Sequence, residues 1–108
     1  MAGNDLIVLA EVPASRQGGT LVITVEMQKH SAAVMTADVG KYFAIRGELE
    51  GRPVTCHAVL GTATYPASWQ AWRIPIEALA GPATVRAAIT NSSKAEAQLT
   101  SRAYFIPK

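Results

Sequence analysis

The sequence predicts an all-β fold of strands joined by short turns. The β-branched residues Val, Ile and Thr number 25 of 108, and they fall in runs separated by Gly, Pro, Asn and Ser. Within most of these runs apolar and polar side chains alternate, which gives a strand one apolar and one polar face. At 49% apolar and 17% charged residues, the chain can build a core and does not have the composition of a disordered segment.

The clearest strand covers residues 20–28, in which one face is entirely apolar: Leu21, Ile23, Val25 and Met27. The same alternation predicts five further strands, over 41–49, 53–60, 69–76, 84–90 and 97–106. In the strand 53–60 the predicted inward residues are Val54, Cys56, Ala58 and Leu60. Glu50-Gly51-Arg52 forms a turn before this strand, and Thr90 to Lys94 forms the last hairpin loop.

Three segments alternate less clearly. Leu6 to Ala10 is apolar on both faces, so as a strand it contacts its own domain or another subunit on each face. Ser31 to Thr36 is either a short strand or an extended connection. Glu77 to Ala80 has the length of about one helical turn, a common way to pass between two sheets. Seven to eight strands with turn signals every 8 to 12 residues or so predict an immunoglobulin-like antiparallel β-sandwich, with a small β-barrel as the alternative.

Charge and cysteine content exclude several classes of protein. Ten Lys and Arg against eight Asp and Glu give a net charge of +2, and the basic residues are scattered singly, so we expect no nucleic-acid partner. No apolar run approaches the ~20 residues that cross a bilayer, so we expect no membrane contact. A lone Cys56 cannot form an internal disulfide, and the N-terminus lacks the pattern of a signal peptide, so we expect synthesis in the cytoplasm.

The sequence predicts no catalytic or metal site. Cys56 and His57 are neighbours on a predicted strand and point to opposite faces, so the imidazole cannot activate the thiol. We expect Cys56 to be buried and His57 exposed. His30 and His57 lack the spacing of metal ligands, the acidic residues are dispersed, and no glycine-rich phosphate loop occurs. We therefore expect a protein that is not an enzyme, with no cofactor, no metal and no small-molecule substrate.

Residues 65–72 are the most suggestive stretch for binding, because two tryptophans three residues apart on a strand face opposite ways. If Trp72 joins Ile74 and Ile76 in the core, Trp69 projects outward with Arg73. Tyr65 then lies in the preceding loop. Trp and Arg are enriched at protein contacts, whereas a loop that folds back over Trp69 would bury it. Both arrangements remain open.

A carbohydrate-binding module is the alternative for the same aromatics. Sugar platforms pair aromatic rings with carboxylates or amides that bind the hydroxyls, and in the sequence only Gln70 and Ser68 are near Trp69. Fluorescence quenching by glycans would indicate this function, and quenching on assembly would indicate a subunit contact.

One part of the sequence is similar to a known family. The stretch Trp72-Arg73-Ile74-Pro75-Ile76-Glu77-Ala78-Leu79-Ala80-Gly81-Pro82, then the strand Ala83 to Thr90 and Leu99-Thr100-Ser101-Arg102-Ala103-Tyr104-Phe105-Ile106, resembles small immunoglobulin-like structural domains of tailed-bacteriophage virions. In the second half of those domains an aromatic-containing strand ends in an I-P-x-x-x-L turn, followed by Pro, an alternating strand, a polar hairpin and a closing strand. The resemblance covers roughly residues 40–107.

The resemblance implies a non-enzymatic virion protein, made in the cytoplasm of an infected bacterium and assembled in many copies on a head or tail. Its partners would be other virion proteins and copies of itself. We expect a single domain over 1–108, with 1–19 as a candidate arm or subunit-contacting segment. The predicted partner-binding residues are Leu6, Ile7, Val8, Leu9, Tyr65, Trp69 and Arg73.

Overall fold

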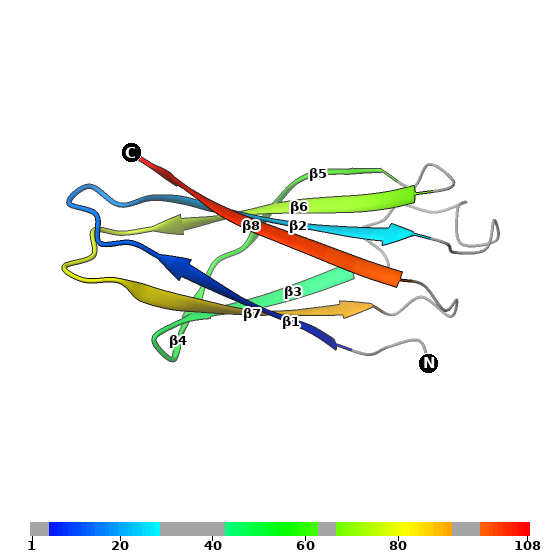
Figure 1. Cartoon of the computed structure of the whole chain (residues 1–108), viewed down its shortest axis with the longest axis horizontal. Helices are drawn as coiled ribbons and strands as arrows, with labels where there is room; N and C mark the ends of the chain where they lie inside the picture. The colour runs from blue at the N-terminus through cyan, green and yellow to red at the C-terminus, as the bar shows by residue number, and fades with distance from the viewer. Residues whose placement is uncertain (1–4, 29–42, 63–66, 92–97) are drawn as a thin grey trace.

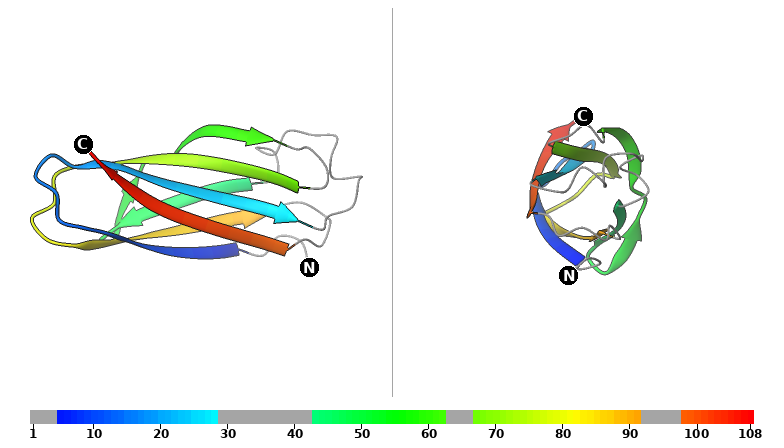
Figure 2. Two further views of the ribbon diagram at one scale, coloured as in Figure 1. Left: turned by 45° about the horizontal axis from the view of Figure 1, so that its top comes forward. Right: turned by 90° about the vertical axis from the view of Figure 1, so that its right-hand side faces the viewer.

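The computed structural model describes residues 5–28, 43–62, 67–91 and 98–108, and over these ranges it contains eight β-strands and no helix (Figure 1). The strands form two antiparallel sheets of four strands each, stacked as the two layers of a sandwich (Figure 2). The predicted all-β sandwich is therefore confirmed. The strands remain in two separate hydrogen-bonded sheets, which rules out the small closed barrel.

The first sheet has the strand order β1-β7-β3-β4. Its strands are β1 (Asp5–Val12), β7 (Ala83–Asn91), β3 (Phe43–Leu49) and β4 (Arg52–Val54). β1 is an edge strand and pairs with β7 along its whole length, from Asp5 opposite Thr90 to Val12 opposite Ala83. The segment that is apolar on both faces is thus a full strand of this sheet.

The second sheet has the order β5-β6-β2-β8. Its strands are β5 (His57–Thr62), β6 (Ala67–Ile76), β2 (Gly19–Gln28) and β8 (Gln98–Pro107). β2 lies between β6 and β8 and pairs with both, so that Ile23 is opposite Trp72 on one side and Ala103 on the other. Residues far apart in the chain therefore meet across β2.

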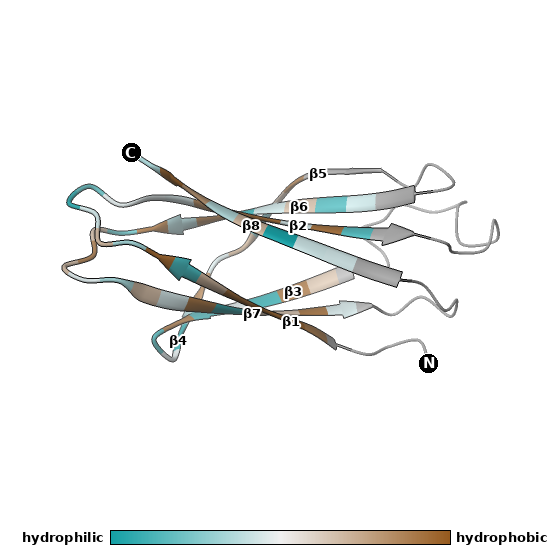
Figure 3. Ribbon diagram, viewed as in Figure 1, coloured by the Kyte–Doolittle hydropathy of each residue, from teal (hydrophilic) through white to brown (hydrophobic). Residues whose placement is uncertain are grey.

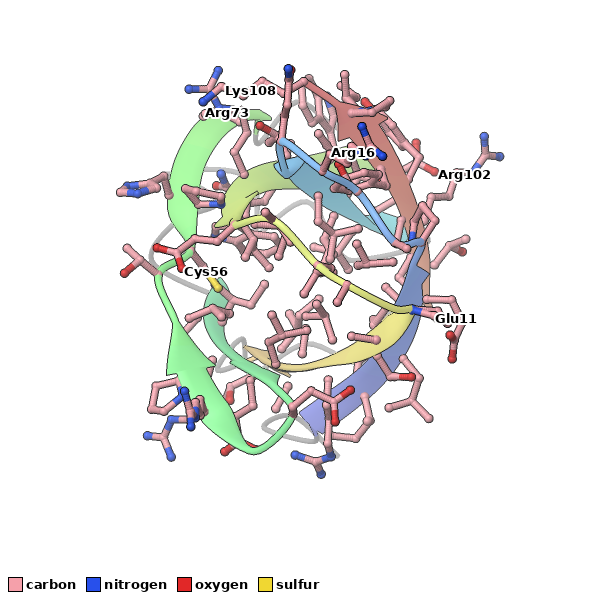
Figure 4. All side chains as sticks on the ribbon, turned by 90° about the vertical axis from the view of Figure 1, so that its left-hand side faces the viewer. Glu11, Arg16, Cys56, Arg73, Arg102 and Lys108 are labelled. Atoms are coloured by element: carbon pink, nitrogen blue, oxygen red, sulfur yellow. The ribbon has the colours of Figure 1, made fainter. Side chains whose placement is uncertain are left out.

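Alternating residues of both sheets fill the space between the layers. The buried core consists of Val8, Ala10, Val12, Leu21, Ile23, Val25, Trp72, Ile74, Ile76, Val85, Ala87 and Ile89. Figure 4 shows these apolar side chains between the sheets, while labelled charged side chains such as Arg73 and Arg102 point away. Since these residues recur every second position, the inward faces predicted for 20–28 and 69–76 are confirmed, except at Met27, whose side chain lies outside the described residues.

The connection between β3 and β4 is a tight hairpin turn. Leu49 pairs with Arg52, which leaves Glu50 and Gly51 as the two loop residues. Both have positive φ, 52° and 80°. This combination is typical of a type I′ turn, whose twist matches that of the flanking strands. The predicted turn is confirmed.

At one end of the sandwich the β1–β2 connection is bound to the β6–β7 connection. Ser15 and Leu79 exchange two backbone N–H···O bonds of 3.0 and 2.8 Å. The carbonyl of Gly18 accepts from the Ser15 hydroxyl at 2.9 Å and from the Lys108 N–H at 3.0 Å. Gly18 has a φ of 73°, and a Cβ there would overlap the Ile76 carbonyl oxygen, so glycine is required at this position.

The predicted strand 53–60 is wrong in two respects. Ala58, which we predicted to point inward, is exposed, and two strands cover the segment instead of one. β4 ends at Val54 and β5 begins at His57, and the chain crosses from the first sheet to the second between them. Val54 and Cys56 both pack against the core, so the apolar alternation continues across the crossing and imitates one strand. A bulge between Ala58 and Leu60 then interrupts the alternation.

Residues 77–80 form no helical turn, contrary to the prediction; Leu79 forms an isolated β-bridge with Ser15 instead. Their predicted role as a passage between sheets is confirmed, since β6 and β7 belong to different sheets. The segment 31–36 and most of the loop 90–94 lie outside the described residues.

Candidate binding surfaces

A polar hollow with one aromatic wall lies on the outward face of β6, β2 and β8. Its volume is about 310 Å³, and its lining consists of Thr24, Glu26, Trp69, Thr100 and Arg102. The strand register explains this grouping. Glu26 lies between Trp69 on one neighbouring strand and Thr100 on the other, and Thr24, two residues earlier, lies opposite Arg102. Residues two apart on a strand share a face, so the five side chains form two adjacent rows. We call this site the Trp69 hollow.

The two tryptophans lie on opposite faces of β6, as predicted. Trp72 is 4% exposed and belongs to the core, whereas Trp69 is half-buried and lines the hollow. Between them, Gln70 is buried and pairs with inward-facing Val25. Its Nε2 donates to the Ala71 carbonyl at 3.0 Å. Gln70 therefore does not line the hollow, although the sequence suggested it as a polar neighbour of Trp69.

A second surface is apolar and follows the edge strands β1 and β8, which lie side by side although they belong to different sheets (Figure 2). Its large exposed side chains are Ile7 (43%), Leu9 (68%), Tyr104 (54%) and Ile106 (51%). Figure 3 shows apolar residues along much of β1. We call these four residues the β1–β8 surface. Exposed apolar side chains on neighbouring edge strands are candidates for an interaction site.

A second hollow, of about 500 Å³, lies where the chain crosses from β4 to β5. Apolar side chains dominate its lining, which consists of Leu49, Arg52, Pro53, Val54, Thr55, His57, Pro75, Glu77, Ala78 and Leu79. The strands β4 and β5 are the edge strands on the opposite side of the two sheets from β1 and β8 (Figure 2).

The residues predicted for partner contacts are distributed between the core and the surface. In β1, Leu6 and Val8 point inward and pack in the core, which leaves Ile7 and Leu9 for a partner. Trp69 lines the hollow, and Arg73 is exposed on the same outward face, opposite His57. Tyr65 lies outside the described residues. The predicted residues that remain accessible therefore lie on two different surfaces: Ile7 and Leu9 on the β1–β8 surface, and Trp69 in the Trp69 hollow.

Sequence reasoning missed the residues that complete both surfaces. These are Thr24, Glu26, Thr100 and Arg102 around Trp69, and Tyr104 and Ile106 beside β1. Their outward orientation could be predicted, because each alternates with an inward residue. What was missing is the order of the strands, which places β8 next to β2 and next to β1.

The Cys56 thiol is poorly suited to act as a nucleophile. Burial raises its pKa, and a hydrogen bond involving the Gly47 backbone offsets this only in part. A raised pKa leaves less thiolate at neutral pH. Cys56, which we expected to be buried, is only half-buried against the core (Figure 4). His57 is exposed, as expected. Within the described ranges, no group of three or more His, Cys, Asp and Glu side chains could hold a metal ion.

Comparisons with known proteins give no relative: no protein-family model, no curated protein and no solved structure matches the chain. In the part of the chain described above, no helix is long and apolar enough to cross a membrane. A function must therefore be inferred from the surfaces themselves.

Proposed function

We propose that this chain is a non-enzymatic structural protein that assembles with copies of itself through the β1–β8 surface, as a component of a tailed-bacteriophage head or tail. The exposure of Leu9, at 68%, is the observation that carries the proposal. Its inward neighbours Val8 and Ala10 already serve the core, so the apolar outward face of β1 has no role in the fold of this chain.

The energetics support a contact at this surface. Full burial of one large aliphatic side chain contributes about 1.5 to 3 kcal/mol, and the β1–β8 surface presents several of them. Glu11, two residues from Leu9 along β1 on this face, accepts a 2.7 Å hydrogen bond from the Thr84 hydroxyl on β7.

The virion assignment rests on the resemblance over residues 40–107. The passage from β6 through residues 77–82 to β7 in the other sheet is consistent with the motif of that family, an I-P-x-x-x-L turn before a strand. The immunoglobulin-like type of the sandwich belongs to the same proposal.

Light scattering over a concentration series tests the proposed contact with the substitution Leu9→Glu. Leu9 lies opposite Arg86 on the outward face, so a glutamate there gains a favourable cross-strand partner and leaves the fold intact. The matched control is Val59→Glu, which introduces the same charge at another exposed apolar residue, 40% exposed, on β5.

The wild-type chain and Val59→Glu should both exceed the monomer mass of 11.4 kDa as concentration rises, and Leu9→Glu should remain monomeric. A wild-type chain that stays monomeric at millimolar concentration, or equal loss of association in both variants, would overturn the proposal.

A further inference from the structure

We infer that the Trp69 hollow is a binding site for a neutral saccharide. This inference depends on a different surface from the proposed function, and on the meeting of three strands rather than on any sequence motif. An aromatic ring, a carboxylate, a guanidinium and two hydroxyls converge on one face of the sheet.

The dimensions suit a sugar ring. Neighbouring strands are about 4.8 Å apart, so Trp69 on β6 and Thr100 on β8 begin roughly 10 Å apart with Glu26 between them. A pyranose ring fits between such walls. The volume of about 310 Å³ is at the lower end of the range for small-molecule sites, which is appropriate for a short saccharide.

The chemistry of the lining matches both sides of a sugar. A pyranose has an apolar C–H face, which packs on an indole, and a rim of hydroxyls that donate and accept hydrogen bonds. The Glu26 carboxylate accepts hydrogen bonds from hydroxyls, and it has about four lone-pair sites, so it can bind a ligand while keeping partners within the protein. Thr24 and Thr100 donate and accept, and Arg102 only donates.

The charges favour a neutral ligand. Glu26 and Arg102 carry opposite charges and line the same hollow, so the site offers no net charge to attract an anionic or a cationic ligand. Hydrogen bonds to ionised side chains are about twice as strong as neutral ones, which allows a small and open site to hold hydroxyl groups against competition from water.

The hollow and the β1–β8 surface share no residue, although both use β8. Tyr104 of that surface follows Arg102 of the hollow by two residues on the same outward face, whereas Ile7 and Leu9 belong to the first sheet. Substitutions in one surface therefore leave the residues of the other unchanged, and each proposal can fail without the other.

Titration with neutral hexaoses of glucose, mannose, xylose and N-acetylglucosamine at millimolar concentration tests the inference, with tryptophan emission and amide NMR shifts as readouts. Trp72 is 4% exposed, so a change in emission reports mainly on Trp69. We expect at least one glycan to shift the emission and the amide signals of β2, β6 and β8 around the hollow.

Two variants and a control complete the test. Trp69→Ala and Glu26→Gln should each weaken binding by about ten-fold or more, which corresponds to about 1.4 kcal/mol. Arg86→Ala removes an exposed arginine from the outward face of the other sheet and should leave affinity unchanged. Circular dichroism checks that each variant is folded. No response to any of the glycans, or binding that survives Trp69→Ala and Glu26→Gln, would overturn the inference.

Discussion

Replacing each tryptophan of β6 by alanine in turn tests which of the two side chains packs in the core and which lies at the surface. In Trp72→Ala the lost side chain is 4% exposed, lies opposite Ile23 and belongs to the buried cluster between the sheets. Removing such a side chain costs about 3 to 5 kcal/mol, from lost burial and from the cavity that remains. For a domain of this size about 1 kcal/mol lowers the melting temperature by roughly 4 °C, so we expect a drop of roughly 12 to 20 °C.

Urea and thermal unfolding followed by circular dichroism measure these changes without a tryptophan signal. Trp69→Ala is the matched variant, since it removes the same side chain from the outward face of the same strand. It should cost about 1 kcal/mol or less, because Trp69 is half-buried at the surface. Equal destabilisation by the two variants, or a cost below about 1 kcal/mol for Trp72→Ala, would refute the inward and outward assignment of β6.

Three further predictions concern turns and the thiol. Gly18→Ala should lower stability by more than about 1 kcal/mol in thermal melts, since its Cβ would meet the Ile76 carbonyl, whereas Gly81→Ala, with open space around it, should be nearly neutral. Glu50→Asn should raise stability by about 0.5 kcal/mol, because asparagine tolerates the positive φ of 52° there; a loss would contradict the turn assignment. Alkylation of Cys56 by iodoacetamide at neutral pH should be slower than that of a free cysteine and should accelerate as pH rises, because burial raises the thiol pKa; the rate of free cysteine would contradict this.

Much of the fold could be predicted because β-strand faces are encoded locally. On β6, Trp72, Ile74 and Ile76 recur every second residue, and this alone separates the core face from the outward face that carries Trp69. The same alternation identified the inward face of β2.

The crossing between β4 and β5 could not be predicted, because both strands face the same interior. Val54 and Cys56 point toward the core from either side of the crossing, so their spacing is that of a single strand. The sequence also did not determine which residues of β1 pack in the core, because both faces of this strand are apolar. A shift of one residue in pairing with β7 would exchange Val8 for Leu9, and only the register settles it.

The candidate sites depend on contacts between distant parts of the chain. Glu26, Trp69 and Arg102 come from β2, β6 and β8 and meet because β2 lies at the centre of its sheet. The strands that carry Tyr104 and Leu9 are likewise neighbours only because the edges of the two sheets are adjacent. The alternation of side chains along one strand predicts which face is buried, but it does not predict which strands are neighbours in a sheet.

A dilution series of amide NMR spectra of the full chain tests the central proposal most directly, because it locates any contact between copies residue by residue. We expect the concentration-dependent shifts to cluster on Ile7, Leu9, Tyr104 and Ile106 and their strand neighbours, and to disappear in Leu9→Glu. Spectra that do not change with concentration, or shifts that cluster around the β4–β5 crossing instead, would contradict the proposal that this protein assembles through the β1–β8 surface.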